Sequence, residues 1–177
     1  MKIFLKTEDE IQLMREANRL VGLTLAELAK SIRPGISTLQ LDKIADEFIR
    51  DHGAVPTFKG FPNPFGAPFP ASICTSVNNV VVHGIPNAET ILEEGDIISI
   101  DCGTLLNGFN GDSCYTFCVG EVAVDVKKLL EVTKTSLYKA IDAAQAGKHL
   151  GDVGAAVQDY CEFFGYGIVR ELTGHGI

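Results

Sequence analysis

Apolar residues recur at helical spacing in four parts of the chain, which predicts four amphipathic helices. Near the N-terminus, Thr7 and Glu10 form a capping-box pattern, and apolar positions continue with a period of about 3.6 residues towards Pro34. Ser37 and Gln40 repeat the capping pattern at the start of a second apolar stripe. Both segments therefore predict helices that pack through one buried face.

Two more helices are predicted in the second half of the chain, over residues 126–146 and 152–164. Each is followed by a glycine, Gly147 or Gly165, and glycine commonly ends a helix. In the first of these helices the positions expected to face inward are Leu129, Leu130, Val132, Leu137, Ala140, Ile141 and Ala144.

Short segments rich in β-branched residues predict strands between these two pairs of helices. The segments 72–77, 80–83, 97–101 and 168–172 have this composition. Asn107-Gly108 is a dipeptide that favours a type I′ turn. The strand that ends near residue 101 is therefore expected to continue into a β-hairpin.

Two aspartates on the predicted hairpin bear most directly on chemistry. If Leu106 pairs with Phe109, then Gly103 lies opposite Asp112. Side chains alternate between faces along a strand, so Asp101 and Asp112 share one face, roughly 7–8 Å apart at Cα. Carboxylates at that separation would reach one divalent cation or bracket a pair of ions. Gly103, which has no side chain, is expected to leave the space between them open.

A second interpretation of the two aspartates needs no ligand. Most acidic residues on strands are exposed, and both side chains would then be hydrated on an open sheet face. The apolar residues around them argue against this, because an unpaired carboxylate among apolar side chains is costly. A register slip of one residue would place the aspartates on opposite faces and remove the argument for a metal site.

Composition limits the classes of partner. The net charge of −8 argues against a general nucleic-acid or anionic-membrane surface. No apolar run approaches the roughly 18 residues that span a bilayer. The first residues also lack the pattern of a signal peptide, so we expect a cytoplasmic location. At 177 residues and 46% hydrophobic content, the chain fits one globular domain or one large half of a bigger one.

The five cysteines occur without the spacing of a structural zinc site, and an odd number disfavours a disulfide framework. They are Cys74, Cys102, Cys114, Cys118 and Cys161. The three at positions 102, 114 and 118 lie on the predicted hairpin, and we expect them on the face opposite the aspartates, as small packing residues. A nucleophilic role is disfavoured because no base is placed beside them.

A proline-rich loop over residues 56–70 contains most of the chain's seven prolines and several phenylalanines. Such a loop fits either the lining of an apolar pocket or an irregular loop held by its own aromatic rings. His83 and His175 are the two histidines with informative neighbours. His83 follows a predicted strand, where a lone histidine is usually a hydrogen-bonded structural residue. His175 lies between two glycines, where the backbone approaches a site closely.

Four segments of the chain together resemble type I methionine aminopeptidases. They are Asn78-Asn79-Val80-Val81-Val82-His83-Gly84-Ile85-Pro86, Asp96-Ile97-Ile98-Ser99-Ile100-Asp101, Asn107-Gly108-Phe109-Asn110-Gly111-Asp112 and Thr173-Gly174-His175-Gly176-Ile177. Each alone is weakly specific, but the four in order, within a likeness that runs from about Thr7 to Ile177, are highly specific. The resemblance implies an α+β pita-bread fold with an antiparallel sheet and helices on its outer face.

The resemblance also implies an activity and a set of site residues. The activity is metal-dependent removal of the initiator methionine from nascent proteins and peptides. Asp101, Asp112 and His175 would bind two divalent metal ions, drawn from cobalt, manganese, iron and zinc, with Asp112 bridging both. His83 would contact the substrate and assist at the scissile amide. The partner would be the N-terminus of a peptide or nascent chain, near the ribosome in the cytoplasm.

Four residues resemble those that shape the methionine pocket of the family: Phe58, Phe61, Phe69 and Cys74. Phe61 and Phe69 stand where the family often has tyrosines. The loop that carries them is longer than its usual form. These residues are therefore the expected substrate-binding residues, together with His83.

The resemblance has a limit at the end of the sequence. The family uses two further glutamate ligands downstream of Gly174-His175-Gly176, and the sequence ends before them. We therefore expect residues 1–177 to form a single catalytic-type domain that is incomplete at its C-terminus, with the N-terminal half of the fold and the start of the second half. Low metal affinity and self-association through the exposed sheet face are expected consequences.

Two alternative functions stay open at the level of sequence. One is a catalytically inactive, shortened paralogue that keeps the shape of an aminopeptidase and acts as a binding module. The other is a dipeptidase of the prolidase type, which shares the paired aspartates. The segment Val82-His83-Gly84-Ile85-Pro86 is unusual for prolidases, and a prolidase would cleave Xaa-Pro peptides without a preference for methionine.

Overall fold

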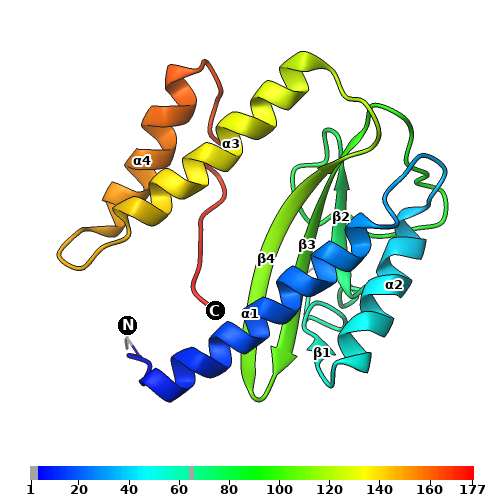
Figure 1. Ribbon diagram of the computed structural model, residues 1–177, viewed down its shortest axis with the longest axis horizontal. Coiled ribbons are helices and arrows are strands. Elements are labelled where there is room, and N and C mark those ends of the chain that lie inside the picture. The colour runs from blue at the N-terminus through cyan, green and yellow to red at the C-terminus, as the bar shows by residue number, and fades with distance from the viewer. Residues whose placement is uncertain (1–3, 64–65) are drawn as a thin grey trace. The chain divides into compact units, whose positions relative to one another are not determined.

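The computed structural model describes residues 4–63 and 66–177 (Figure 1). Pro64 and Phe65 of the proline-rich loop lie outside the described residues, as do the first three residues of the N-terminal segment. The chain divides into two compact units, a sheet unit that runs to Glu121 and a helical unit, Val122–Gly176. The single catalytic-type domain over residues 1–177 stays a prediction.

Two helices and an antiparallel sheet make up the described part of the sheet unit. The elements are α1 (Glu8–Ala29), α2 (Thr38–Asp51), β1 (Val55–Pro56), β2 (Ile73–Val77), β3 (Ile97–Leu106) and β4 (Phe109–Cys118). The long strand β3 is central, because β4 pairs along the whole of one edge while β2 and β1 pair with the other. The predicted antiparallel sheet is confirmed.

Both predicted capping boxes are present at the helix N-termini. Glu10 N donates to Thr7 Oγ1 at 3.3 Å, and Thr7 N donates to Glu10 Oε2 at 2.8 Å. At α2, Gln40 N donates to Ser37 Oγ at 3.2 Å, and Ser37 N donates to Gln40 Oε1 at 2.9 Å. These bonds satisfy donors that the first turn of a helix leaves without partners, so both helices begin where the sequence predicted.

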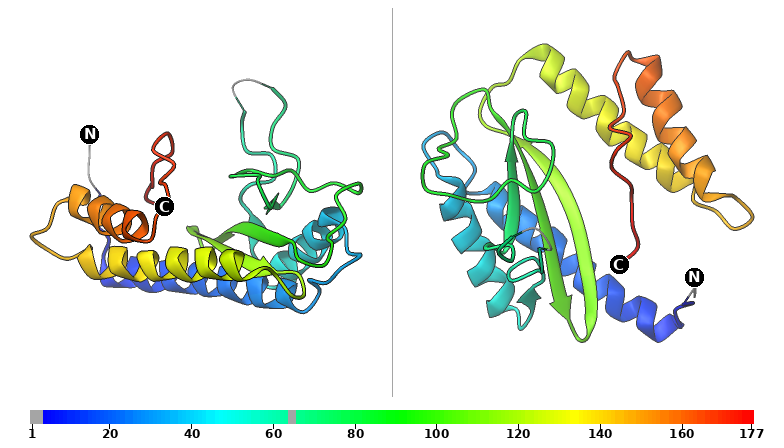
Figure 2. Two further views of the ribbon diagram at one scale, coloured as in Figure 1. Left: turned by 90° about the horizontal axis from the view of Figure 1, so that it is seen from above. Right: turned by 180° about the vertical axis from the view of Figure 1, so that it is seen from behind.

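The core of the sheet unit lies between the sheet and the two helices, which cover the same sheet face (Figure 2, left). α1 lies against β3 and β4, and α2 lies against β1 and β2. Fully buried side chains from both layers meet there, among them Leu28, Leu41, Ile49, Ile73, Ile98 and Ile100. The loop between β1 and β2 projects on the other side of the sheet (Figure 2, left).

Residues 80–83 do not form the predicted strand. The three valines are exposed, and His83 has a φ of 57°, which interrupts extended backbone. The chain then returns to β2, where Thr75 N donates to Gly84 O at 2.8 Å. A side chain at Gly84 would overlap the carbonyl group of Thr75, so this close approach needs glycine. The segment is a loop that presents His83.

The helical unit consists of α3 (Val124–Ala143) and α4 (Leu150–Phe163), which pack against each other. Lys128 and Lys139 lie over the rings of Phe164 and Tyr160, at 4.9 Å and 4.7 Å from the ring centroids. These are cation–π contacts, which help to hold the pair together. No helix among residues 4–63 and 66–177 is long and apolar enough to cross a membrane.

Two predictions for the helical unit were wrong. Val132 and Ala140 are buried as expected, but several other positions predicted to face inward are exposed: Leu129, Leu137, Ile141 and Ala144. Within this unit α3 has one helix beside it, so one stripe of its apolar surface is covered. The predicted strand at 168–172 is irregular chain, since a strand needs a neighbouring strand to pair with and the described helical unit offers none.

Candidate metal and substrate site

The hairpin of β3 and β4 has the predicted register. The two residues of its Asn-Gly turn have φ values of 52° and 81°, as a type I′ turn requires. Leu106 pairs with Phe109, and Gly103 pairs with Asp112. Asp101 and Asp112 therefore share one sheet face. The opposite face carries Thr104, whose Oγ1 donates to the backbone of α1, so the aspartates point away from the helices.

The two aspartates lie close enough to perturb each other. Burial raises the pKa of Asp101, and the charge of Asp112, together with a hydrogen bond between the two side chains, raises it further. The neighbouring His83 acts in the opposite sense and lowers the pKa of Asp101. A divalent cation bound by both carboxylates would offset their repulsion, which is the electrostatic basis for a metal site on this face.

The space above Gly103, between the two aspartates, is filled rather than open. A Cβ at Gly103 would overlap Thr57 Oγ1 and would lie 2.8 Å from Cε1 of Phe58. The expectation of an open gap was wrong because Thr57 N donates to Gly103 O at 3.1 Å, which brings the start of the loop onto β3. This contact places the Phe58 ring on the same sheet face as the carboxylates.

Three cysteines lie on the aspartate face: Cys114 and Cys118 of the hairpin, and Cys74 of β2. Cys114 pairs with Asp101 across β4 and β3, and Cys74 pairs with Asp101 from the other side, across β2 and β3. Directly opposed residues share a face, so the predicted placement of Cys114, and of Cys118 four residues later, was wrong. Cys102 is buried on the helix-covered face, as predicted. Burial, and then the charge of Asp101, raise the pKa of Cys74 and of Cys114 to about 12, so both are protonated at neutral pH.

His83 is exposed, and the loop that carries it is fixed at both ends. Asn78 N donates to Ile97 O, and Ile97 N donates to Asn78 Oδ1, both at 3.0 Å. On the other side, Gly84 N donates to Ser76 Oγ at 3.2 Å. The positive φ of His83 is uncommon for a residue with a side chain, and such conformations cluster at functional sites.

The three predicted pocket phenylalanines lie in the loop between β1 and β2. Gly60 N donates to Phe69 O at 2.8 Å, and Phe69 N donates to Phe61 O at 3.0 Å, so the loop closes on itself through its backbone. Phe58 and Phe69 are half-buried, whereas Phe61 is 65% exposed. Phe58 connects this loop to the aspartate face through its contact with Gly103.

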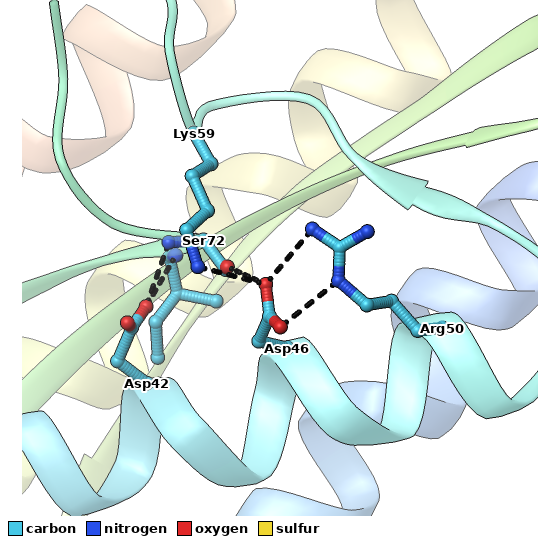
Figure 3. Close-up of polar contacts among 6 residues, drawn as sticks. Asp42, Asp46, Arg50, Lys59 and Ser72 are labelled. Atoms are coloured by element: carbon cyan, nitrogen blue, oxygen red, sulfur yellow. Dashed lines mark hydrogen bonds and ion pairs between the residues drawn. The ribbon is translucent and has the colours of Figure 1, made fainter.

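Two acidic residues of α2 hold the ends of this loop, and the sequence analysis did not single them out (Figure 3). Asp42 Oδ1 accepts hydrogen bonds from Ser72 N at 2.7 Å and from Ile73 N at 3.1 Å. Asp46 Oδ1 accepts a hydrogen bond from Ser72 Oγ at 2.7 Å and pairs with Lys59 Nζ at 3.2 Å. The signal in the sequence is a pair of acidic residues four positions apart, which places both on the same helix face.

The two acids differ in their electrostatics. Burial raises the pKa of Asp42, although hydrogen bonds from the backbone of Ser72 and Ile73 oppose this effect. Hydrogen bonds from Arg50, Ser72 and Lys59 lower the pKa of Asp46, with the Arg50 contribution the largest. Asp46 is therefore a stable anion at neutral pH.

His175 belongs to the helical unit, where it is exposed and its Nδ1 lies 3.1 Å from Gly176 O. In the part of the chain that the structure describes, no group of three or more histidine, cysteine, aspartate or glutamate side chains is placed to hold a metal ion. The structure thus brings Asp101 and Asp112 together, with His83 near enough to lower the pKa of Asp101, and His175 as a ligand stays a prediction.

Comparison with known proteins identifies the family. Residues 12–177 match metallopeptidase family M24. Methionine aminopeptidase 1 of Bacillus subtilis (strain 168) is 50% identical over 175 residues, which cover 99% of this chain and 68% of that protein. The crystal structure of methionine aminopeptidase from Rickettsia prowazekii has a TM-score of 0.93 and 40% identity, with 99% of this chain and 68% of that one covered. The chain therefore belongs to metallopeptidase family M24, and the predicted pita-bread fold is confirmed.

Within this family the chain groups with the methionine aminopeptidases. Prolidase from Pyrococcus furiosus has a TM-score of 0.78 at 20% identity, which is a likeness of fold alone. The sequence evidence thus favours a methionine aminopeptidase over a dipeptidase of the prolidase type. Membership of a metallopeptidase family implies the use of a divalent metal.

Proposed function

We propose that this chain removes N-terminal methionine from peptides and nascent proteins in a metal-dependent reaction. The observation that carries the proposal is the pair of carboxylates, Asp101 and Asp112, which share one sheet face with the ring of Phe58. The 50% identity to a methionine aminopeptidase supports the same substrate class.

Asp101, Asp112 and His175 are the proposed ligands, and the proposed ions are two in number and drawn from cobalt, manganese, iron and zinc. Burial, and then the charge of Asp112, raise the pKa of Asp101, and the repulsion between the two carboxylates supports a cation between them. Oxygen and nitrogen donors of this kind suit divalent ions of the first transition row. When bound, such ions supply a water of lowered pKa as the nucleophile for the methionyl carbonyl group.

The remaining site residues would bind and orient the substrate. Phe58, Phe61, Phe69 and Cys74 would enclose the methionine side chain and exclude water from it. His83, fixed on its loop beside Asp101, would hold a hydrogen bond to the scissile amide. The protonated Cys74 thiol suits an apolar thioether better than a thiolate would.

The proposed substrate implies where the protein works. Initiator methionine is exposed as a nascent chain leaves the ribosome, so we propose a cytoplasmic location and a nascent-chain partner. Self-association stays a prediction, and sedimentation analysis of the chain would test it. A catalytically inactive binding module is a second candidate, and it is favoured by the lack of a three-ligand cluster among the described residues.

The test is methionine release from a peptide that begins Met-Gly, with added Mn²⁺ or Co²⁺, and with EDTA and Asp112→Ala as controls. A peptide with an Xaa-Pro start tests the prolidase alternative in the same assay. We expect metal-dependent release from the Met-Gly peptide that is lost with EDTA and in the variant. Peptide binding without release would support the binding module instead.

A further inference from the structure

We propose that Asp46 and Lys59 are positioning residues that determine the side-chain selectivity of the methionine pocket, an inference that rests on the proposed function. Neither residue lies on the hairpin that carries the two aspartates. They act through the loop between β1 and β2, whose ends they tie to α2 (Figure 3).

Lys59 and Ser72, the two loop residues bound to Asp46, lie close to pocket residues in the sequence. Lys59 directly follows Phe58, whose ring packs against Gly103 beside the carboxylates. Ser72 lies at the other end of the loop, two residues before Cys74, which pairs with Asp101. Asp46 therefore fixes the distance between the two chain segments that bring pocket residues to the sheet face.

One oxygen atom of Asp46 makes both contacts with the loop. Asp46 Oδ1 accepts from Ser72 Oγ at 2.7 Å and lies 3.2 Å from Lys59 Nζ. A single carboxylate oxygen thus couples entry and exit of the loop, and α2 is itself anchored in the core through its buried residues Leu41 and Ile49. A shift of Lys59 would move the backbone that carries Phe58.

Arg50 is a matched control for Lys59. Arg50 also pairs with Asp46, with its Nε 2.9 Å from Oδ2 and its Nη2 3.2 Å from Oδ1, but both bonds are made within α2. The side chains of Lys59 and Arg50 have similar exposure, 45% and 49%. Lys59→Met and Arg50→Met therefore each remove one cation from Asp46, and Lys59→Met alone releases the loop.

Hydrogen exchange in the full chain measures how far the contact between Lys59 and Asp46 restrains the loop. The amides of Gly60 and Phe69, which close the loop, should exchange faster in Lys59→Met than in Arg50→Met or the unmodified chain. Equal exchange in the two variants would overturn the inference, whatever the state of the catalytic site.

Selectivity is measured by calorimetric titration with methioninol and phenylalaninol in the presence of Mn²⁺. Both probes carry an amine and a side chain but no amide bond to cleave. We expect Lys59→Met to weaken methioninol binding about two- to fivefold, which is the effect expected from the loss of an exposed ion pair. We expect the same substitution to weaken phenylalaninol binding by a smaller factor. Arg50→Met should leave the ratio of the two affinities unchanged.

The outcomes separate the inference from the function on which it rests. A faster-exchanging loop in Lys59→Met with an unchanged affinity ratio would overturn the selectivity role and leave the proposed function intact. An unmodified chain that binds neither probe would overturn the proposed function, and the selectivity role with it, while the exchange data would still report on the restraint.

Discussion

Phe58 packs against Gly103, the residue of β3 that lies directly opposite Asp112. This contact joins the loop of predicted pocket residues to the strand that carries Asp101. The position needs glycine because any side chain there would occupy the volume of Thr57 Oγ1 and of the Phe58 ring. The two carboxylates and the Phe58 ring are therefore parts of one packed structure within the sheet unit.

Gly103→Ala should displace the Phe58 ring and destabilise the sheet unit. We expect the free energy of unfolding to fall by roughly 1–3 kcal/mol, as in other overpacked sites, when measured by urea denaturation. Gly22→Ala on α1 is the control, because a Cβ there meets no heavy atom within 4 Å. That variant should be neutral or more stable by about 0.5–1 kcal/mol. Equal effects of both substitutions would contradict the packing of Phe58 on Gly103.

Asp42 and Asp46 should give opposite dependences of stability on pH. The folded-state pKa of Asp42 is raised, so its contribution to stability is present below its unfolded pKa, about 4, and is lost as pH rises through the folded value. Asp42→Asn keeps the oxygen that accepts from Ser72 and Ile73 but carries no charge. We expect this variant to gain stability relative to the unmodified chain as pH rises from 3 to 7, measured by thermal unfolding at each pH.

The pKa of Asp46 is lowered, so the sign reverses. Its contribution to stability is present above an unfolded pKa of about 4 and is lost as pH falls. Asp46→Asn should therefore lose stability relative to the unmodified chain at pH 7, and this difference should begin to shrink as pH falls below about 4. Parallel pH profiles for the two variants would show that the contacts in Figure 3 do not govern these carboxylates.

Substitutions on α1 test the placement of the core. Leu28 is fully buried, whereas Leu23 on the same helix is 44% exposed. Leu28→Ala should cost about 2–5 kcal/mol of unfolding free energy through lost burial and a residual cavity. Leu23→Ala should change it by no more than roughly 0.5 kcal/mol. If the denaturant midpoints of the two variants coincided, α1 would have to pack through a different face.

The sequence was most informative where local rules decide the structure. Asn107-Gly108 determined the turn type, and the alternation of side chains then placed Asp101 and Asp112 on one face. The two capping boxes fixed the starts of α1 and α2 within one residue. Each of these features depends on residues within a few positions of each other in the chain.

Features that depend on distant contacts were missed or wrong. The valines before His83 have strand composition, but the positive φ of His83 and the contact of Gly84 with Thr75 make the segment a loop. The loop residues that bind Asp46 lie 13 and 26 residues away, at Lys59 and Ser72, so no local pattern predicts these contacts. The face of Cys114 was misjudged although it follows from the correct register.

The most direct test of the central claim is calorimetric titration of Mn²⁺ into the chain and into Asp101→Asn and Asp112→Asn, with Ser113→Ala as the control. Ser113 neighbours Asp112 on β4 but pairs with Cys102 on the other face of the hairpin. We expect each aspartate substitution to weaken Mn²⁺ binding by about tenfold or more, since a charged ligand is lost, and the serine substitution to leave it unchanged. Equal Mn²⁺ affinity in all four chains would contradict the claim that Asp101 and Asp112 bind a metal ion together.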